Sequence, residues 1–168
     1  MIYKEFLMKI VGLITEYNPF HNGHLYHIQQ AKRTTGADAV IVVMSGDYVQ
    51  RGVPAVMPKR LRAESALECG ASAVFELPVC YSTGSAELFA ESAVALLDQL
   101  QIVDSLCFGN ECGDLDALSE IADLLCQEPK DYRSLFKKTF KKRTFLSVCT
   151  QKSFERISSG KKLCGSFR

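Results

Sequence analysis

Four short apolar segments recur along the first 110 residues of the chain. Each has seven or eight residues and lacks the strict alternation of apolar and polar positions that marks a half-exposed strand. Continuous apolar runs of this length are typical of strands buried on both faces of a parallel sheet. The segments are 9–16, 37–44, 72–78 and 103–109.

Helical patterns follow each of these segments. After the first, Leu25, Ile28 and Ala31 recur at helical spacing, and Gly36 marks the stop. Further helices are expected at 58–70, 84–100 and 114–129. Strand and helix thus alternate four times, which predicts an α/β domain with an open, doubly wound parallel sheet of the Rossmann-like kind. Such folds bind ligands beyond the carboxyl ends of their strands.

The first strand runs into the stretch EYNPFHNGHL, which places His21, Gly23 and His24 where a strand turns into a helix. A helix N-terminus presents free N–H groups and partial positive charge, and therefore favours phosphate. Gly23 leaves room for close approach, and the two imidazoles can donate hydrogen bonds to phosphoryl oxygens. Position and electrostatics of this kind suffice for nucleotidyl transfer.

The alternative is that His21 and His24 are only polar loop and cap residues. We favour a functional interpretation, because two histidines flanking a glycine at such a turn are an unusual coincidence. His27 follows one helical turn after His24 and is interpreted as a lesser phosphate or scaffold contact. No third ligand accompanies the histidines, so no protein metal site is predicted.

Gly109 ends the fourth apolar segment and is expected at the same rim of the sheet. A glycine there lets the backbone approach a nucleotide closely. The alternative is a glycine needed only for a turn with positive φ.

Charge is unevenly distributed along the chain. Residues 1–129 hold 8 Lys and Arg against 17 Asp and Glu, a net charge of −9, whereas residues 130–168 hold 12 against 2, a net charge of +10. A basic tail on an acidic domain suggests a nucleic-acid partner. Cysteines within apolar runs indicate a reduced, cytoplasmic protein, and no apolar run is long enough to cross a membrane.

The HNGH stretch resembles the HxGH signature of the adenylyl-transferring α/β nucleotidyltransferases. The sequence from Met8 to about Leu125 is more specific than this motif, and it closely resembles the bacterial tRNA(Met) cytidine acetate ligase family. The resemblance makes residues 1–7 an N-terminal extension and residues 8–129 a nucleotide-binding α/β domain. The stretches that carry it are KIVGLITEYNPFHNGHLYHI, VVMSGDYVQRGVPAVMPKRLRAESALECGA, FELPVCYSTGSAELFAESAV and VDSLCFGNECGDL.

The resemblance implies a reaction and a site. The family activates acetate with ATP to acetyl-adenylate, then acetylates N4 of the wobble cytidine of elongator tRNA(Met). Mg2+ is expected to accompany ATP. The implied catalytic residues are His21 and His24. The implied ATP-binding residues are Ile14, Thr15, Glu16, Tyr17, Asn18, Pro19, Phe20, His21, Asn22, Gly23, His24, Leu25, Tyr26, His27 and Gly109.

Several weaker candidates lie near the same rim. Lys59, Arg60 and Arg62 are interpreted either as contacts to phosphate or tRNA or as a solvated helix face. Glu76 is expected to be a buried carboxylate at a strand end, with a functional or a structural role. The loop that holds Asp47 and Gln50–Arg51 could close over the site, and residues 81–86 could line an acetate pocket.

Residues 130–168 depart from the family, whose members continue with a phrase like Phe-Pro-x-Ala-Arg-x-x-Ala-Leu. Degenerate codons for Thr144 to Glu155, read one base out of frame, can spell that phrase. We therefore hypothesise a frameshift near residue 143, which the coding DNA would test. The tail is then partly helical and disordered after about Phe140, its charge is accidental, and the family's tRNA-binding region is missing.

Two other functions are compatible with the pattern. A small-molecule adenylyltransferase of the nicotinamide-nucleotide or pantetheine-phosphate type shares the motif. An inactive nucleotide-binding remnant would bind ATP without acetate-dependent turnover.

Overall fold

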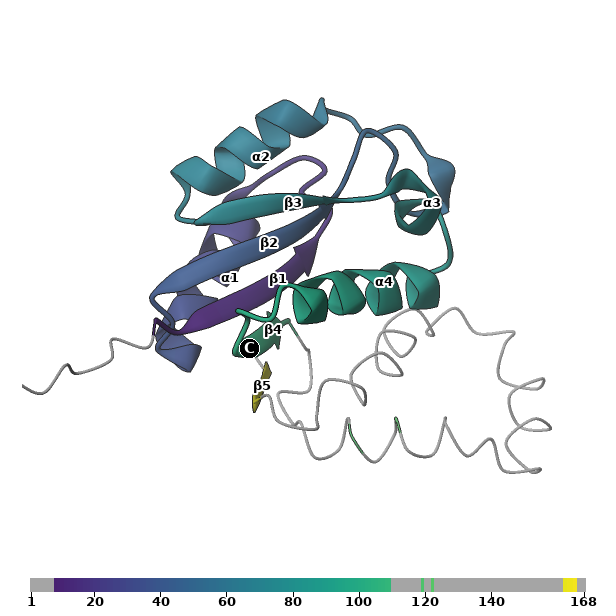
Figure 1. Cartoon of the computed structure of the whole chain (residues 1–168). Helices are drawn as coiled ribbons and strands as arrows, with labels where there is room; N and C mark the ends of the chain where they lie inside the picture. The colour runs from purple at the N-terminus through teal and green to yellow at the C-terminus, as the bar shows by residue number, and fades with distance from the viewer. Residues whose placement is uncertain (1–7, 110–118, 120–121, 123–161, 166–168) are drawn as a thin grey trace, which may run out of the picture.

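The computed structural model describes residues 8–109, 119, 122 and 162–165, in which five parallel strands form one sheet in the order β3-β2-β1-β4-β5 (Figure 1). The strands are β1 (Ile10–Thr15), β2 (Ala39–Ser45), β3 (Ala73–Leu77), β4 (Ser105–Phe108) and β5 (Lys162–Gly165). The helices are α1 (Asn22–Thr35), α2 (Lys59–Glu68), α3 (Val79–Ser82), α4 (Ala86–Gln99) and the 3-10 turn η1 (Gln50–Gly52). The predicted α/β fold with a parallel sheet is confirmed.

The strand order reverses at β1. The chain steps from β1 to β2 to β3 on one side, and then returns through α4 to place β4 on the other side of β1. In register, Thr15 lies opposite Met44, and Ser45 lies opposite Leu77, so the carboxyl ends of β1, β2 and β3 share one rim. The reversal between β1 and β4 is the topological switch point, where folds of this kind bind ligands.

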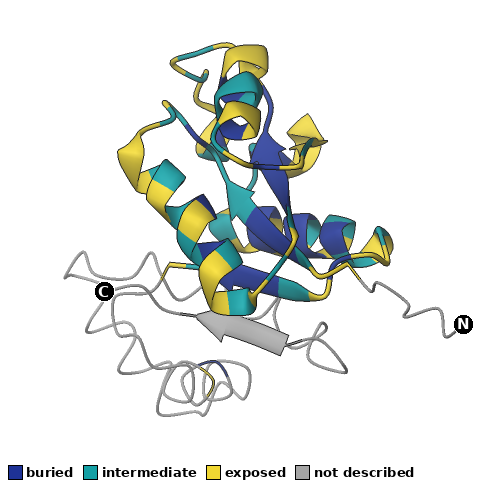
Figure 2. Cartoon of the chain, turned by 90° about the vertical axis from the view of Figure 1, so that its left-hand side faces the viewer, coloured by how far each residue is buried: buried dark blue, intermediate teal, exposed yellow. Residues whose placement is uncertain are grey.

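Two apolar layers cover the sheet, one on each face. Figure 2 shows that the buried residues, in dark blue, gather in the strands at the centre of the domain. Alternate strand residues pack against α1 and α2 on one face, and the intervening residues pack against α4 on the other. At Gly12 a Cβ would lie 2.8 Å from Leu97 Cδ1, so the glycine lets α4 pack closely against β1. The central strands β1 and β2 are largely buried on both faces, which explains their continuous apolar pattern, whereas the edge strand β3 is partly exposed.

Three features differ from the sequence-based expectations or lie beyond them. The short helix α3 was not predicted. The predicted helix 114–129 lies outside the described residues, apart from 119 and 122, which are helical. Strand β5 comes from the tail, where we expected no packing, and the rest of the tail lies outside the described residues. Four residues are too few to show the alternation of apolar and polar positions that marks a strand. β5 pairs with β4 because the edge of β4 offers open backbone hydrogen-bonding groups.

Across the described ranges, the structure has no helix that is both long and apolar enough to span a membrane.

Candidate active site at the carboxyl rim of the sheet

The two motif histidines cap the first helix reciprocally. His21 is the N-cap of α1, and its Nδ1 accepts a hydrogen bond from the Gly23 N–H at 3.1 Å. The His24 Nδ1 in turn accepts from the His21 backbone N–H at 3.2 Å. This is a capping box built from two imidazoles. Because each Nδ1 accepts, each neutral ring carries its proton on Nε2, which leaves two Nε2–H donors for a ligand.

Gly23 is required by this arrangement. The two imidazole rings are stacked, with centroids 3.7 Å apart and planes inclined by 26°. A Cβ on Gly23 would lie 2.9 Å from Cε1 and 3.1 Å from Nδ1 of the His21 ring. The glycine therefore lets the His21 ring fold back over the first turn of α1, in addition to any room that it leaves for a phosphate.

His24 is held in an aromatic environment. Its ring lies 4.8 Å from the Tyr17 ring and 5.5 Å from the Phe20 ring. Burial, followed by the nearby His21 and His27, lowers the pKa of His24 from 6.5 to about 4. His24 is therefore neutral near pH 7 and can donate from Nε2 without carrying charge. Burial also lowers the pKa of His27.

The predicted segment 14–27 divides into supporting and exposed residues. The Glu16 carboxylate accepts a hydrogen bond from the Gln50 N–H at 2.8 Å, and the Asn18 side chain accepts from the Val56 N–H at 2.7 Å. Tyr17 is only 1% exposed. By contrast Pro19, His21, Asn22 and Gly23 are exposed at the rim. We therefore expect a ligand to meet the exposed residues, with the others holding the turn.

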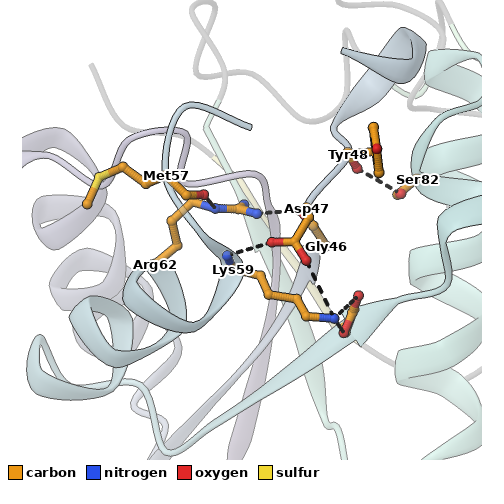
Figure 3. Close-up of polar contacts among 8 residues, drawn as sticks. Gly46, Asp47, Tyr48, Met57, Lys59, Arg62 and Ser82 are labelled. Carbon is orange, nitrogen blue, oxygen red and sulfur yellow. Dashed lines mark hydrogen bonds and ion pairs between the residues drawn. The ribbon is translucent and has the colours of Figure 1, made fainter. Parts of the chain in front are cut away.

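Arg62 corrects one of the interpretations made from sequence. Its side chain is fully buried and donates to the carbonyl oxygens of Met57 (3.0 Å) and Gly46 (Figure 3). It also donates to the carbonyl oxygen of Glu16. It thus ties the ends of β1 and β2 to the start of α2, and is neither a solvated residue nor a contact for phosphate or RNA. Its spacing from the buried Ala66, four residues later on α2, is the sequence signal that could have placed it inside.

Lys59, Asp47 and Glu76 form a charged cluster beside Arg62 (Figure 3). Lys59 Nζ lies 2.9 and 2.8 Å from the two Glu76 oxygens and 3.8 Å from Asp47 Oδ2. The hydrogen bond to Glu76 raises the pKa of Lys59. The Glu76 side chain is 47% exposed, so the expected buried carboxylate is wrong: β3 lies at the edge of the sheet, where this position faces solvent. Arg60 is exposed and pairs with Glu64 at 2.8 Å.

The loop between β2 and α2 is anchored to its neighbours. Besides the bonds to Glu16 and Asn18, the Tyr48 carbonyl accepts a hydrogen bond from the Ser82 hydroxyl at 3.1 Å. Ser82 is buried, and its hydrogen bond to this loop was not predicted from sequence. Tyr81 is exposed, and Ser85 caps α4 by accepting from the Leu88 N–H at 3.2 Å. A role for residues 81–86 in an acetate pocket stays a prediction.

Gly109 lies directly after β4, across the switch point from the histidine turn. Its φ is outside the left-handed range, so the alternative of a glycine kept for a positive-φ turn is wrong. A Cβ built there meets no described atom within 4 Å. Close approach of a nucleotide remains the prediction for this residue. Among the described side chains, no group of three or more His, Cys, Asp or Glu could hold a metal ion.

Comparisons with known proteins agree with this geometry. A family model described as HIGH Nucleotidyl Transferase matches residues 8–166. The tRNA(Met) cytidine acetate ligase of Acetivibrio thermocellus is 52% identical over 130 residues, which cover 77% of this chain and 31% of that protein. The ligase of the same name from Caldanaerobacter subterraneus subsp. tengcongensis is 51% identical over 135 residues, with 80% and 34% covered. This chain therefore spans about a third of the length of these relatives.

Solved structures extend the likeness to three dimensions. The crystal structure of Thermotoga maritima TmcAL bound with alpha-thio ATP superposes with a TM-score of 0.80 at 34% identity, covering 96% of this chain and 47% of that chain. The apo structure of the same protein gives a TM-score of 0.71 at 41% identity, covering 90% and 36%. With the motif, the fold and the family match in agreement, the chain belongs to the HIGH Nucleotidyl Transferase family.

Proposed function

We propose that this chain carries the ATP site of a tRNA(Met) cytidine acetate ligase, working in the cytoplasm. The chain activates acetate with ATP, and the acetyl group passes to N4 of the wobble cytidine of elongator tRNA(Met). The observation that carries the proposal is the reciprocal imidazole cap of α1 at the switch point of the sheet. It is supported by the names of relatives about half identical to this chain and by a similar protein crystallised with an ATP analogue.

The geometry suits the first chemical step. The triphosphate lies over the N-terminus of α1, where the Nε2–H groups of His21 and His24 donate to its oxygens. A carboxylate oxygen of acetate attacks the α-phosphorus, the bond to the β-phosphate oxygen breaks, and pyrophosphate leaves with acetyl-adenylate remaining. Donors that are fixed in position before the reaction stabilise the charge that develops on the phosphoryl oxygens without needing to reorganise. Mg2+ is expected on the phosphates of ATP rather than on a site of this chain.

The second step needs no further energy source. The N4 amine of cytidine attacks the acetyl carbonyl carbon of the mixed anhydride, the carbon–oxygen bond to phosphate breaks, and AMP leaves. The amine loses one proton as the amide forms. Because this chain spans about a third of its relatives, the tRNA step is tested separately from the first.

Acetate-dependent exchange of labelled pyrophosphate into ATP tests the proposal. We expect exchange with acetate and none with nicotinamide mononucleotide or pantetheine phosphate. Exchange with either of those acceptors, but not with acetate, would instead establish the small-molecule adenylyltransferase. ATP binding in calorimetry without any exchange would contradict catalysis by this chain and leave a nucleotide-binding unit.

A further inference from the structure

Tyr17 has an unusual backbone for a large side chain. It follows β1 by two residues with a φ of 48°, in the left-handed region that bulky residues rarely adopt. Such conformations persist only where the surroundings hold them, and they gather at functional sites. The side chain that this backbone directs inward is 1% exposed.

The buried Tyr17 ring lies against the histidine turn. Its centroid is 4.8 Å from the His24 ring, with planes inclined by 60°, and 4.8 Å from the Phe20 ring, inclined by 70°. His24 is therefore enclosed by Tyr17 and Phe20, in addition to the His21 ring that stacks on it. Tilted aromatic pairs at these separations are favourable, so Tyr17 restricts the rotation of the His24 ring.

The burial of Tyr17 excludes two simpler roles for its side chain, direct contact with the nucleotide and acid–base catalysis. A side chain this deeply buried cannot contact a nucleotide that lies over the exposed turn. Burial raises the pKa of its hydroxyl to about 12, so the group stays protonated and offers no acid or base near pH 7. What remains is the ring, whose edge and face orient the imidazole above it.

We propose that Tyr17 is a positioning residue, whose buried ring fixes His24 with Nδ1 on the His21 backbone N–H and Nε2 directed to the phosphates. The left-handed backbone at Tyr17 is the device that brings the ring beneath the first turn of α1. The effect on catalysis rests on the proposed function, whereas the effect on the His24 ring does not.

The experiment compares three variants of the whole chain. Tyr17→Leu removes the ring but keeps an apolar side chain, and Tyr17→Phe removes only the hydroxyl. Phe89→Leu is the matched control, because Phe89 is also a buried ring (8% exposed) but belongs to α4, which packs on the opposite face of the sheet. Long-range 1H–15N spectra of the histidines report the tautomer of His24, and pyrophosphate exchange at saturating ATP reports catalysis.

We expect one Nε2–H tautomer of His24 in the wild-type chain, in Phe89→Leu and in Tyr17→Phe. In Tyr17→Leu the signals should average between tautomers, and the exchange rate should fall by about tenfold to a hundredfold, the usual cost of a misplaced catalytic group. Phe89→Leu should lower the melting temperature as Tyr17→Leu does, but it should change neither the tautomer of His24 nor the exchange rate.

An unchanged His24 tautomer in folded Tyr17→Leu would overturn the proposal, and so would equal effects from Phe89→Leu. A loss in Tyr17→Phe as large as in Tyr17→Leu would assign the effect to the hydroxyl and also overturn it. If the tautomer responds as expected while no variant, and not even the wild-type chain, exchanges pyrophosphate, the positioning role stands and the proposed function fails.

Discussion

Helices α1 and α2 both begin at the carboxyl rim, yet their N-termini are used in opposite ways. At α2, Asp47 accepts a hydrogen bond from the Lys59 backbone N–H at 3.0 Å, so a carboxylate of the chain itself occupies the positive end of the helix. At α1 the cap is imidazole, the first turn holds no acidic residue, and His21 to Gly23 are exposed. The end of α2 is satisfied within the fold, whereas the end of α1 stays open to an anion.

The two ends are linked by Arg62. Arg62 lies on α2, and its buried guanidinium donates hydrogen bonds to the Glu16 carbonyl beside the histidine turn and to the Gly46 carbonyl after β2. It is therefore not available to a ligand at the surface. Charged side chains at the rim thus support the structure around α2, whereas α1 presents preorganised imidazole donors, of which His24 is neutral near pH 7. This difference predicts that substitutions at α1 affect chemistry and substitutions around α2 affect stability.

The largest expected effect is that of His24→Ala. Removing one preorganised donor to a transition state typically lowers the rate by about 10²–10³. We expect that loss in acetate-dependent pyrophosphate exchange, with the folded structure retained by circular dichroism. Arg60→Ala, which removes an exposed cation from the start of α2, is the control and should exchange at the wild-type rate. A His24→Ala rate within about threefold of wild type would remove His24 from the mechanism.

Arg62→Met should have the next largest effect, on stability. It leaves the carbonyl of Gly46, in a buried bond, and those of Glu16 and Met57, in part-buried bonds, without this donor. An unsatisfied buried group costs about 1–3 kcal/mol, so we expect a total loss of about 2 kcal/mol or more. Urea unfolding measures it. Arg60→Met should change stability by less than about 0.5 kcal/mol. Equal losses in the two variants would show that the buried guanidinium does not hold the rim.

The sequence predicts the fold better than it predicts the rim. Strands β1 to β4 and the helices α1, α2 and α4 were located because their apolar patterns are local properties of the chain. The histidine turn was also found, because two histidines and a glycine directly after an apolar strand can be recognised in the sequence. Arg62 and Glu76 were misplaced because burial at the rim depends on which strand ends meet and which strand is the edge. The strained backbone of Tyr17 has no sequence signal, since its φ is imposed by packing.

Gly109→Ala tests the other side of the switch point. No described atom lies within 4 Å of the added methyl group and φ is not left-handed, so stability should change by less than about 0.5 kcal/mol. If the backbone approaches the nucleotide there, ATP affinity should fall by about tenfold, which corresponds to about 1.4 kcal/mol. Calorimetric titration with ATP measures the affinity, and thermal unfolding measures the stability. Unchanged affinity in the folded variant would exclude Gly109 from the site.

Asp47→Ala should cost less, and in stability alone. Loss of a side-chain cap typically costs about 1 kcal/mol, and the exposed pairing with Lys59 adds little. Asp47→Asn keeps an acceptor for the Lys59 N–H and should restore most of the loss in urea unfolding. ATP affinity should remain at the wild-type value in both variants, because the proposed function places the phosphates at α1 and not at α2. Weaker ATP binding in Asp47→Ala would place the nucleotide at α2 as well and break the contrast between the two helices.

The smallest effect concerns pH, and it follows from the lowered pKa values of two imidazoles of α1, those of His24 and His27. The pKa of His24 is lowered from 6.5 to about 4 in the folded chain, so between these values the unfolded chain binds a proton that the folded chain does not. Stability is therefore fully present above pH 6.5 and declines as the pH falls toward 4; the lowered pKa of His27 acts in the same direction. His24→Gln removes the contribution of His24 to this pH-dependent loss of stability. The stability of the variant in urea unfolding should therefore decline less than that of the wild type between pH 7.5 and 5.5. Equal declines, or an NMR titration of His24 centred near 6.5, would show that the stacked and buried ring is not held neutral by its surroundings.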